Sequence, residues 1–283
     1  MITCLFISDL HGRIHRYQKL VQMILSEKPD LVFLGGDLLP HGMVASTHDG
    51  GFVAGYLIPT FRQLREEVGD RYPAVFLILG NDDARIEESG IMDGERAGCW
   101  FYAHNRRFEV AGSSIYGYAC VPPTPFLLKD WERYDVSQFV EPGSVSPEEG
   151  FRTVPVSASE TKYGTIQNDL EELTRDADLS RAVFLFHSPP HGTALDRAAL
   201  DGKMVDHVPL DVHVGSIAIR RFIEKRQPLL TLHGHIHEST RLTGSWKEQI
   251  GRTLCINGSH DGPELALVRF DLERPESATR ELL

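Results

Sequence analysis

Residues 2–12 read ITCLFISDLHG, a mostly apolar run of six residues that ends in Ser8, Asp9, Leu10, His11 and Gly12. A short apolar run bounded by turn residues is typical of a buried β-strand. We therefore expect a strand over residues 2–7, with Asp9 and His11 just beyond its carboxyl end.

The segment after this strand leads to a second strand of the same kind. A helical pattern of apolar residues follows, and Pro29 and Asp30 interrupt it, because proline is poorly tolerated inside a helix. A second apolar run, residues 31–34, then leads into Gly36 and Asp37. This order predicts a β-α-β unit in which both strands end at an aspartate.

Short apolar runs alternate with amphipathic helical patterns along most of the chain, which predicts an α/β layer architecture. Further strands are expected at residues 74–79, 108–110, 115–118, 182–186, 229–232, 254–256 and 265–270, and helices at about 57–68, 165–176 and 216–225.

Two stretches interrupt the alternation. Residues 120–164 contain several prolines, among them Pro122, Pro123, Pro125, Pro142 and Pro147, between aromatic and acidic residues, too many breaks for a regular element of the core. Residues 41–51 are rich in glycine, histidine and small polar residues and predict an exposed loop. We expect residues 1–283 to form a single domain, with an ordered, irregular, Pro-rich insertion at about 120–164 near the functional site.

Composition narrows the classes of function. The net charge of -11 argues against a general nucleic-acid binder, because affinity for a phosphate backbone comes from clustered Lys and Arg. No apolar run approaches the ~20 residues that a membrane span needs, and the N-terminus lacks the basic and apolar regions of a signal peptide. These features favour a cytoplasmic protein with no membrane partner. The four scattered cysteines predict reduced, mostly buried thiols.

Metal-ligating residue types follow five of the expected strands. Because ligands of open α/β sheets bind at the carboxyl ends of strands, these residues should converge on one rim although they are distant in sequence. They are Asp9, His11, Asp37, Asn81, His187, His235 and His237.

Each of these motifs also has a purely structural interpretation. Asp9 could cap a helix, Asp37 and Asn81 are ordinary turn residues, and His187 could be a hydrogen-bonded core histidine. The pair His235 and His237 is the sharpest signal, because side chains two residues apart on an extended segment point to the same side.

Taken in order, the motifs resemble those of the calcineurin-like metallophosphoesterase superfamily, D-x-H, G-D, G-N-H with an acid, a solitary His, and G-H-x-H. The corresponding segments here are Asp9-Leu10-His11, Gly36-Asp37, Gly80-Asn81-Asp82-Asp83, His187 and Gly234-His235-Ile236-His237. The resemblance covers residues 1 to about 260. It implies a four-layer α-β-β-α sandwich, in which helices flank two packed mixed sheets.

The resemblance also implies a division of the ligands between two divalent ions. Asp9, His11 and His237 would hold the first ion, Asn81, His187 and His235 the second, and Asp37 would bridge both. Mixed nitrogen and oxygen ligands suit Mn, Fe, Zn, Ni or Co. Two such ions about 3.5–4 Å apart clamp phosphate oxygens and lower the pKa of a bridging water, whose hydroxide attacks phosphorus.

The chain departs from the family pattern at Asp82, where the family often has a histidine that protonates the leaving oxygen. One interpretation is that Asp82 and Asp83 orient histidine ligands, such as His11 or His235, by accepting hydrogen bonds from the ring N–H groups of those histidines. Another is that His191, His41 or His213 supplies the proton. A third is that the substrate has an acidic leaving group that needs little protonation.

We therefore expect a phosphoesterase acting on a small-molecule phosphate ester or nucleotide-like substrate, and the absent histidine favours a phosphodiesterase. A phosphomonoesterase or protein phosphatase, or a non-enzymatic scaffold of the same fold, are the alternatives. Phe126, Trp131 and Tyr134 could form a wall for the substrate or simply bury the insertion, and Arg85 could pair with phosphate or lie on the surface.

Overall fold

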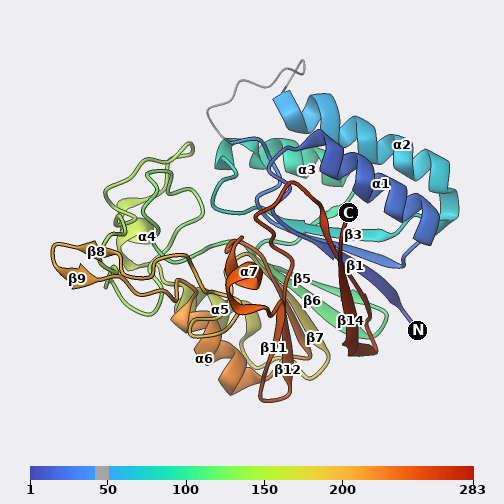
Figure 1. The fold of residues 1–283 in the computed structure, drawn as a ribbon. Helices are drawn as coiled ribbons and strands as arrows, with labels where there is room; N and C mark the ends of the chain where they lie inside the picture. The colour runs from blue at the N-terminus through green and yellow to red at the C-terminus, as the bar shows by residue number, and fades with distance from the viewer. Residues whose placement is uncertain (42–50) are drawn as a thin grey trace.

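The computed structural model describes residues 1–41 and 51–283, and its core consists of two six-stranded sheets (Figure 1). The first sheet has the order β14-β13-β1-β2-β3-β4. Its strands are β1 (Thr3–Ile7), β2 (Leu31–Gly35), β3 (Ala74–Ile78), β4 (Phe101–Tyr102), β13 (Ala266–Asp271) and β14 (Arg274–Leu282).

The second sheet has the order β11-β12-β10-β7-β6-β5. Its strands are β5 (Arg106–Val110), β6 (Ser113–Tyr118), β7 (Ala182–Phe186), β10 (Leu230–His233), β11 (Lys247–Ile250) and β12 (Thr253–Asn257). A separate hairpin pairs β8 (Met204–Val205) with β9 (Val208–Pro209).

Helices cover the outer faces of both sheets. In Figure 1, α1 (Ile14–Glu27), α2 (Ile58–Val68) and α3 (Glu88–Arg96) lie over the first sheet, and α5 (Ile166–Thr174) and α6 (Ile217–Arg226) lie over the second. The short helices are α4 (Ala158–Tyr163), α7 (Ser239–Thr243), a π-turn at Val53–Leu57, and 3-10 turns at Gly69–Arg71 and Arg85–Glu87. None of the helices in the described part of the chain is long and apolar enough to cross a membrane.

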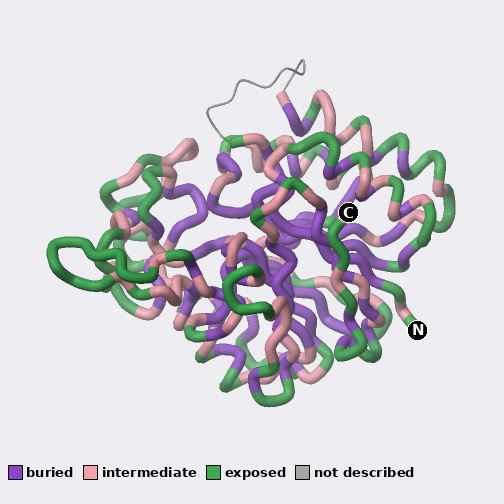
Figure 2. Tube along the Cα trace, in the orientation of Figure 1, coloured by how far each residue is buried: buried purple, intermediate pink, exposed green. Residues whose placement is uncertain are grey.

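The two sheets pack face to face, and aromatic side chains fill the space between them. Phe76 of β3 stacks on Phe33 of β2 with ring centroids 5.8 Å apart, and it meets Phe108 of β5, in the other sheet, at 5.4 Å. Figure 2 shows the strands of both sheets as the most continuously buried part of the molecule. The predicted sandwich of two mixed sheets flanked by helices is therefore confirmed.

Both sheets are mixed, and their parallel strands point toward the same functional edge. Strands β1, β2, β3 and β4 are parallel, and so are β6, β7, β10 and β12. The predicted strands are all present. Strands β4, β11 and β14, which lie at sheet edges, and the separate hairpin of β8 and β9 were not predicted from the sequence. The four cysteines are free and buried, as expected.

The segment expected to be an irregular insertion is anchored beside the end of β3. It contains α4 and several isolated bridges. Trp131 is buried and donates a hydrogen bond from its indole N–H to the carbonyl of Asp83, at 2.8 Å. A buried ion pair joins Lys129 to Glu132 at 2.6 Å. The expected exposed loop at residues 41–51 lies largely outside the described residues.

His104 packs against this insertion and should make the fold sensitive to acid. Its Nδ1 accepts a hydrogen bond from the Ala119 N–H, and burial lowers its pKa to about 3. The unfolded chain therefore takes up a proton near pH 6.5, before the folded protein does, so stability is present above that pH and is lost as pH falls. Between pH 7 and 5 this histidine should reduce the free energy of unfolding by about 1–2 kcal/mol.

Urea unfolding at the two pH values measures this effect. His104→Gln keeps an acceptor for the Ala119 N–H. Between pH 7 and 5, its free energy of unfolding should fall less than that of the wild type. The control is His207→Gln, at an exposed position, which should leave the difference unchanged. An unaltered acid loss in His104→Gln would contradict the assignment.

Candidate metal centre

Side chains from the carboxyl ends of five strands meet at the edge where the two sheets converge. Asp9 and His11 follow β1, Asp37 follows β2, and Asn81 follows β3. From the second sheet come the residues after β7 and β10, namely His187, His235 and His237. The structure thus brings together all seven residues that the sequence singled out.

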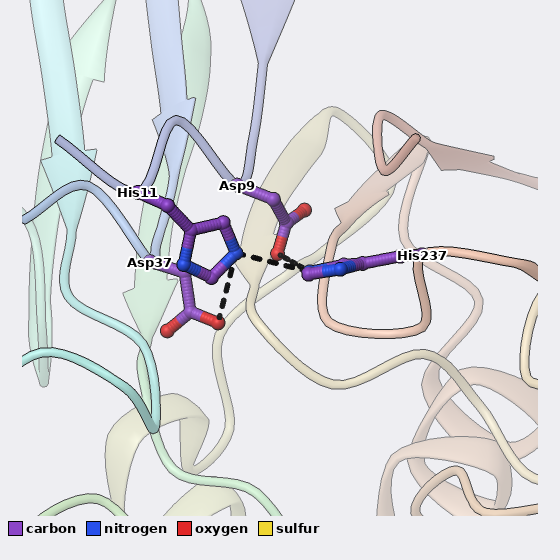
Figure 3. Close-up of side chains that lie close together, drawn as sticks. All are labelled: Asp9, His11, Asp37 and His237. Carbon is purple, nitrogen blue, oxygen red and sulfur yellow. Dashed lines mark hydrogen bonds and ion pairs between the residues drawn. The ribbon is translucent and has the colours of Figure 1, made fainter. Parts of the chain in front are cut away.

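Asp9, His11, Asp37 and His237 form the first group (Figure 3). One ligand atom from each lies within 4.8 Å of the others. The Nε2 atoms of His11 and His237 are 3.1 Å apart, and His237 Nε2 is 3.2 Å from Asp9 Oδ1. Imidazole nitrogens and carboxylate oxygens gathered this closely are the atom types that ligate transition-metal ions.

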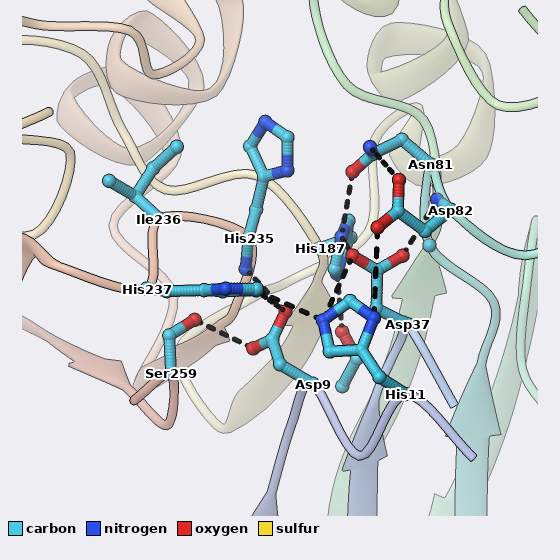
Figure 4. A network of polar contacts seen from close by, with 12 residues as sticks. Asp9, His11, Asp37, Asn81, Asp82, His187, His235, Ile236, His237 and Ser259 are labelled. Atoms are coloured by element: carbon cyan, nitrogen blue, oxygen red, sulfur yellow. Dashed lines mark hydrogen bonds and ion pairs between the residues drawn. The ribbon is translucent and has the colours of Figure 1, made fainter. Parts of the chain in front are cut away.

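The second group shares Asp37 with the first (Figure 4). It contains Asp37, His187 and His235. His187 Nε2 lies 3.2 Å from Asp37 Oδ2 and 3.1 Å from Asn81 Oδ1. The other ring nitrogen, Nδ1, is 2.8 Å from the carbonyl of Gly35 and can donate its proton there. This contact fixes the ring with Nε2 toward the cluster.

The backbone around the cluster is held in uncommon conformations. Asp9, His11, Asp37 and His235 have φ values of 57°, 46°, 51° and 73°. Non-glycine residues rarely adopt the left-handed region, and such strain concentrates at functional sites.

The Gly36-Asp37 motif requires glycine at its first position. The φ of Gly36 is 95°, and a Cβ atom built there would lie 2.6 Å from His187 Nδ1. Only glycine allows the β2 end and the His187 ring to come this close.

The carboxylates of the cluster create a field that attracts positive charge. Burial alone would lower the pKa of His187, but Asp37 and Asp9 outweigh it and raise the pKa to about 10. Burial is likewise outweighed at His237, where Asp9 raises the pKa to about 9. The buried acids Asp9 and Asp37 have lowered pKa values despite burial, because these histidines stabilise their charge. Cations that displace the protons would satisfy the same field.

Residues around the cluster hold its members in place. The Ser259 hydroxyl donates to Asp9 Oδ2 at 2.6 Å, and the guanidinium of Arg16 donates to the Asp9 carbonyl at 2.6 Å. Ser259 was not predicted from the sequence. Its position just past β12, another parallel strand of the second sheet, could have indicated that it lies near the cluster.

The two aspartates after Asn81 have different surroundings. Asp82 Oδ2 lies 3.6 Å from His11 Nδ1 and 3.5 Å from His41 Nε2. Asp83 is fully buried, belongs to neither ligand group and accepts hydrogen bonds from three backbone N–H groups. Asp83 thus connects the loop that carries Asp37 to the loop that carries Asn81.

The three histidines considered as proton donors lie in two places. His41 is beside the cluster, with its ring 6.0 Å from that of His11. His191 contacts Asp211 at 3.4 Å, and its ring is 6.0 Å from His213, which is held by the buried Asp196 at 2.8 Å. His191 and His213 therefore lie together on the wall of the adjoining cavity.

The other residues considered for substrate contact differ in exposure and in distance from the cluster. Trp131 and Tyr134 are buried, whereas Phe126 is 58% exposed and lines the cavity above the cluster. Arg85 pairs with Glu88 at 3.3 Å and lies over the Trp131 ring, away from the cluster. Of these residues, only Phe126 is positioned to meet a substrate at the cluster.

Comparison with known proteins is consistent with this geometry. Residues 2–239 match the family model described as calcineurin-like phosphoesterase. Two solved structures, the second being TT1561 of Thermus thermophilus, match with TM-scores of 0.61 and 0.59. Both are 18% identical, and each alignment covers 99% of this chain and 98% of the other, which shows the fold. No curated protein matches the sequence at a significant level.

Proposed function

The chain belongs to the calcineurin-like phosphoesterase family, and from this premise we propose that it is a two-metal phosphodiesterase acting on a small-molecule phosphate ester. One observation carries the proposal. Six Asp and His side chains from both sheets form two groups that have Asp37 in common, and Asn81 lies against the second group through its contact with His187.

The donor atoms fit a pair of divalent transition-metal ions. Asp9, His11 and His237 would hold one ion, and Asn81, His187 and His235 the other, with one oxygen of Asp37 for each. The mixture of imidazole nitrogens with carboxylate and amide oxygens suits Mn, Fe, Zn, Ni or Co better than Mg or Ca. When bound, two such ions supply the charge that binds phosphate oxygens and activates water.

The surrounding groups keep these side chains in one geometry. Gly35 fixes the ring of His187, Ser259 fixes the carboxylate of Asp9, and the Asp82 N–H donates to Asp37 Oδ1 at 2.9 Å. Such contacts reduce the reorganisation needed when a phosphate binds.

The residue at position 82 supports a preference for diesters. The Asp82 carboxylate lies beside His11 and His41, and although burial raises its pKa to about 6, it is mostly ionised at pH 7 and then has no proton to donate. A diester with an acidic leaving group needs less protonation than an alkyl monoester. His41 and His191 are the proposed donors for less acidic leaving groups.

A panel of phosphate esters tests the proposal. Metal-free protein supplied with Mn²⁺ should hydrolyse bis(p-nitrophenyl) phosphate faster than p-nitrophenyl phosphate. His235→Ala should remove both activities. Preference for the monoester would favour a phosphomonoesterase, whereas inactivity toward both esters would favour a non-enzymatic scaffold.

Asp82 should matter through the ligand that it touches. Asp82→Ala removes the carboxylate beside His11 Nδ1, and we expect metal affinity or kcat/KM to fall about 10–100-fold. Manganese titration and steady-state kinetics measure these changes. Asp82→Asn keeps an oxygen acceptor and should lose less. Equal activity and metal affinity in all three proteins would show that Asp82 does not orient His11.

A further inference from the structure

A cavity of 410 Å³ opens directly above the cluster, and among the described residues its walls are mainly apolar. Asp37, Asn81, Asp82, His235 and His237 form its floor. A molecule whose phosphate lies at the cluster can therefore place one of its organic groups in the cavity. The volume lies within the range typical of small-molecule sites.

One wall comes from the Pro-rich insertion. Pro122, Pro125 and Phe126 lie on one side, with Val136 and Phe139 nearby. Phe126 and Phe139 are 58% and 65% exposed, which is unusual for phenylalanine. Large exposed apolar side chains that gather at one cavity mark a binding surface.

A second wall comes from the segment that carries the β8–β9 hairpin and from the start of α6. Leu200, Leu210 and Val214 of the segment and Ile217 of α6 line it. The hairpin lies beside the insertion (Figure 1), and a Cβ atom at Gly143 would lie 3.4 Å from Val205 and 3.3 Å from Leu210. Two segments distant in sequence therefore enclose the same apolar space.

The charges around the cavity limit what it can accept. No Lys or Arg occurs among the described residues that line it, whereas Glu141, Asp211 and Glu238 do. A second phosphate or carboxylate on the substrate would meet these acids with no Lys or Arg to balance it, because the basic side chains of this wall, His191 and His213, already face Asp211 and Asp196. The organic group should therefore carry no negative charge of its own.

Building on the proposed function, we infer that the substrate is a phosphodiester with a bulky, uncharged, apolar alkyl or acyl group that fills this cavity. The cluster binds its phosphate, and the walls formed by the insertion and the hairpin segment bind its chain. A nucleoside ester fits less well, because its polar sugar and base would lie against walls that are mainly apolar.

A series of alkyl p-nitrophenyl phosphodiesters tests the inference with one leaving group throughout. As the alkyl group lengthens from methyl to butyl to octyl, kcat/KM should rise by up to about three- to fourfold for each methylene that becomes buried. The p-nitrophenyl ester of thymidine 5'-phosphate should be poorer than the octyl ester. A flat series, or preference for the thymidine ester, would overturn the inference while leaving the proposed function intact.

Variants of the cavity wall test whether it sets the preference for long alkyl groups. Phe139→Ser should reduce the octyl-to-methyl ratio of kcat/KM by about tenfold. Phe151→Ser is the matched control, because Phe151 is 52% exposed in the same insertion and is not among the described residues that line the cavity. Its ratio should stay at the wild-type value. Equal ratios in both variants would overturn the role of the wall.

Binding of octylphosphonate, which cannot be hydrolysed, gives a second readout by calorimetry. It should bind more tightly than methylphosphonate to the wild type, and Phe139→Ser should reduce that difference. Equal affinity for the two phosphonates would overturn the inference. If every phosphodiester also proves inert, the proposed function fails, and the inference that rests on it fails too.

Discussion

Asp37→Asn is expected to reduce phosphodiester hydrolysis by at least about 10³-fold, because we propose that Asp37 bridges two ions and the amide has only one oxygen and no negative charge. Asp37 is the only member common to the two described ligand groups. The amide nitrogen cannot act as a ligand, so one ion loses a donor and both lose negative charge. Steady-state kinetics and elemental analysis of the variant measure the two consequences, and bound metal should fall from two ions toward one.

The comparison requires a variant that changes an aspartate without touching the cluster. Asp176→Asn, at an exposed position, should keep wild-type activity and metal content. Thermal unfolding of Asp37→Asn without added metal should show that the chain still folds. A wild-type rate of hydrolysis in Asp37→Asn would contradict the proposed bridging role of Asp37.

Asp83→Ala is expected to have the largest effect on stability, a loss of about 3–5 kcal/mol, because it leaves three buried donors without a partner. The carboxylate accepts from Leu38 N at 3.1 Å, Leu39 N at 2.7 Å and Gly80 N at 2.9 Å. These donors lie in the loops that carry Asp37 and Asn81. Activity should therefore fall as well, even though Asp83 does not reach the cluster.

Chemical denaturation of wild type and variant measures the stability change. Asp83→Asn retains one acceptor oxygen and should lose less than the alanine variant. Asp70→Ala is the matched control, since Asp70 is exposed, and its free energy of unfolding should stay within about 0.5 kcal/mol of the wild type. A loss under about 1 kcal/mol in Asp83→Ala would mean that the three N–H groups find other partners.

The central strands and the cluster were predictable because one physical feature identifies both. β1, β2, β3 and β7 are buried on both faces, so each appears in the sequence as a short continuous apolar run. The polar residues that follow these runs lie at the strand ends. The position of Asp37 or His187 could therefore be predicted from the run before it.

Edge strands carry a weaker signal, because one face or one edge meets solvent. β11 has the sequence KEQI, and β14 has RPESATREL. Charged and polar residues on such strands reduce edge-to-edge aggregation and also remove the apolar run that identifies a strand. The register of β14 depends on its pairing with β13, which sequence periodicity does not report.

Several properties of the site depend on three-dimensional contacts and left no pattern in the sequence. The dipeptide Asp82-Asp83 gives no indication that one side chain faces His11 and the other faces three backbone N–H groups. The sequence offered Phe126 as one possible wall residue of the insertion, but it did not indicate that Gly143 of the insertion lies against Val205 and Leu210, more than sixty residues away in sequence. Contacts between irregular segments have no periodicity.

The most direct test is to titrate metal-free protein with Mn²⁺ while following hydrolysis of bis(p-nitrophenyl) phosphate. A two-metal centre bridged by Asp37 predicts that the metal-free protein is inactive, that two equivalents of Mn²⁺ bind, and that activity reaches its maximum as the second ion binds. Full activity without metal, or an inactive protein with two ions bound, would contradict it.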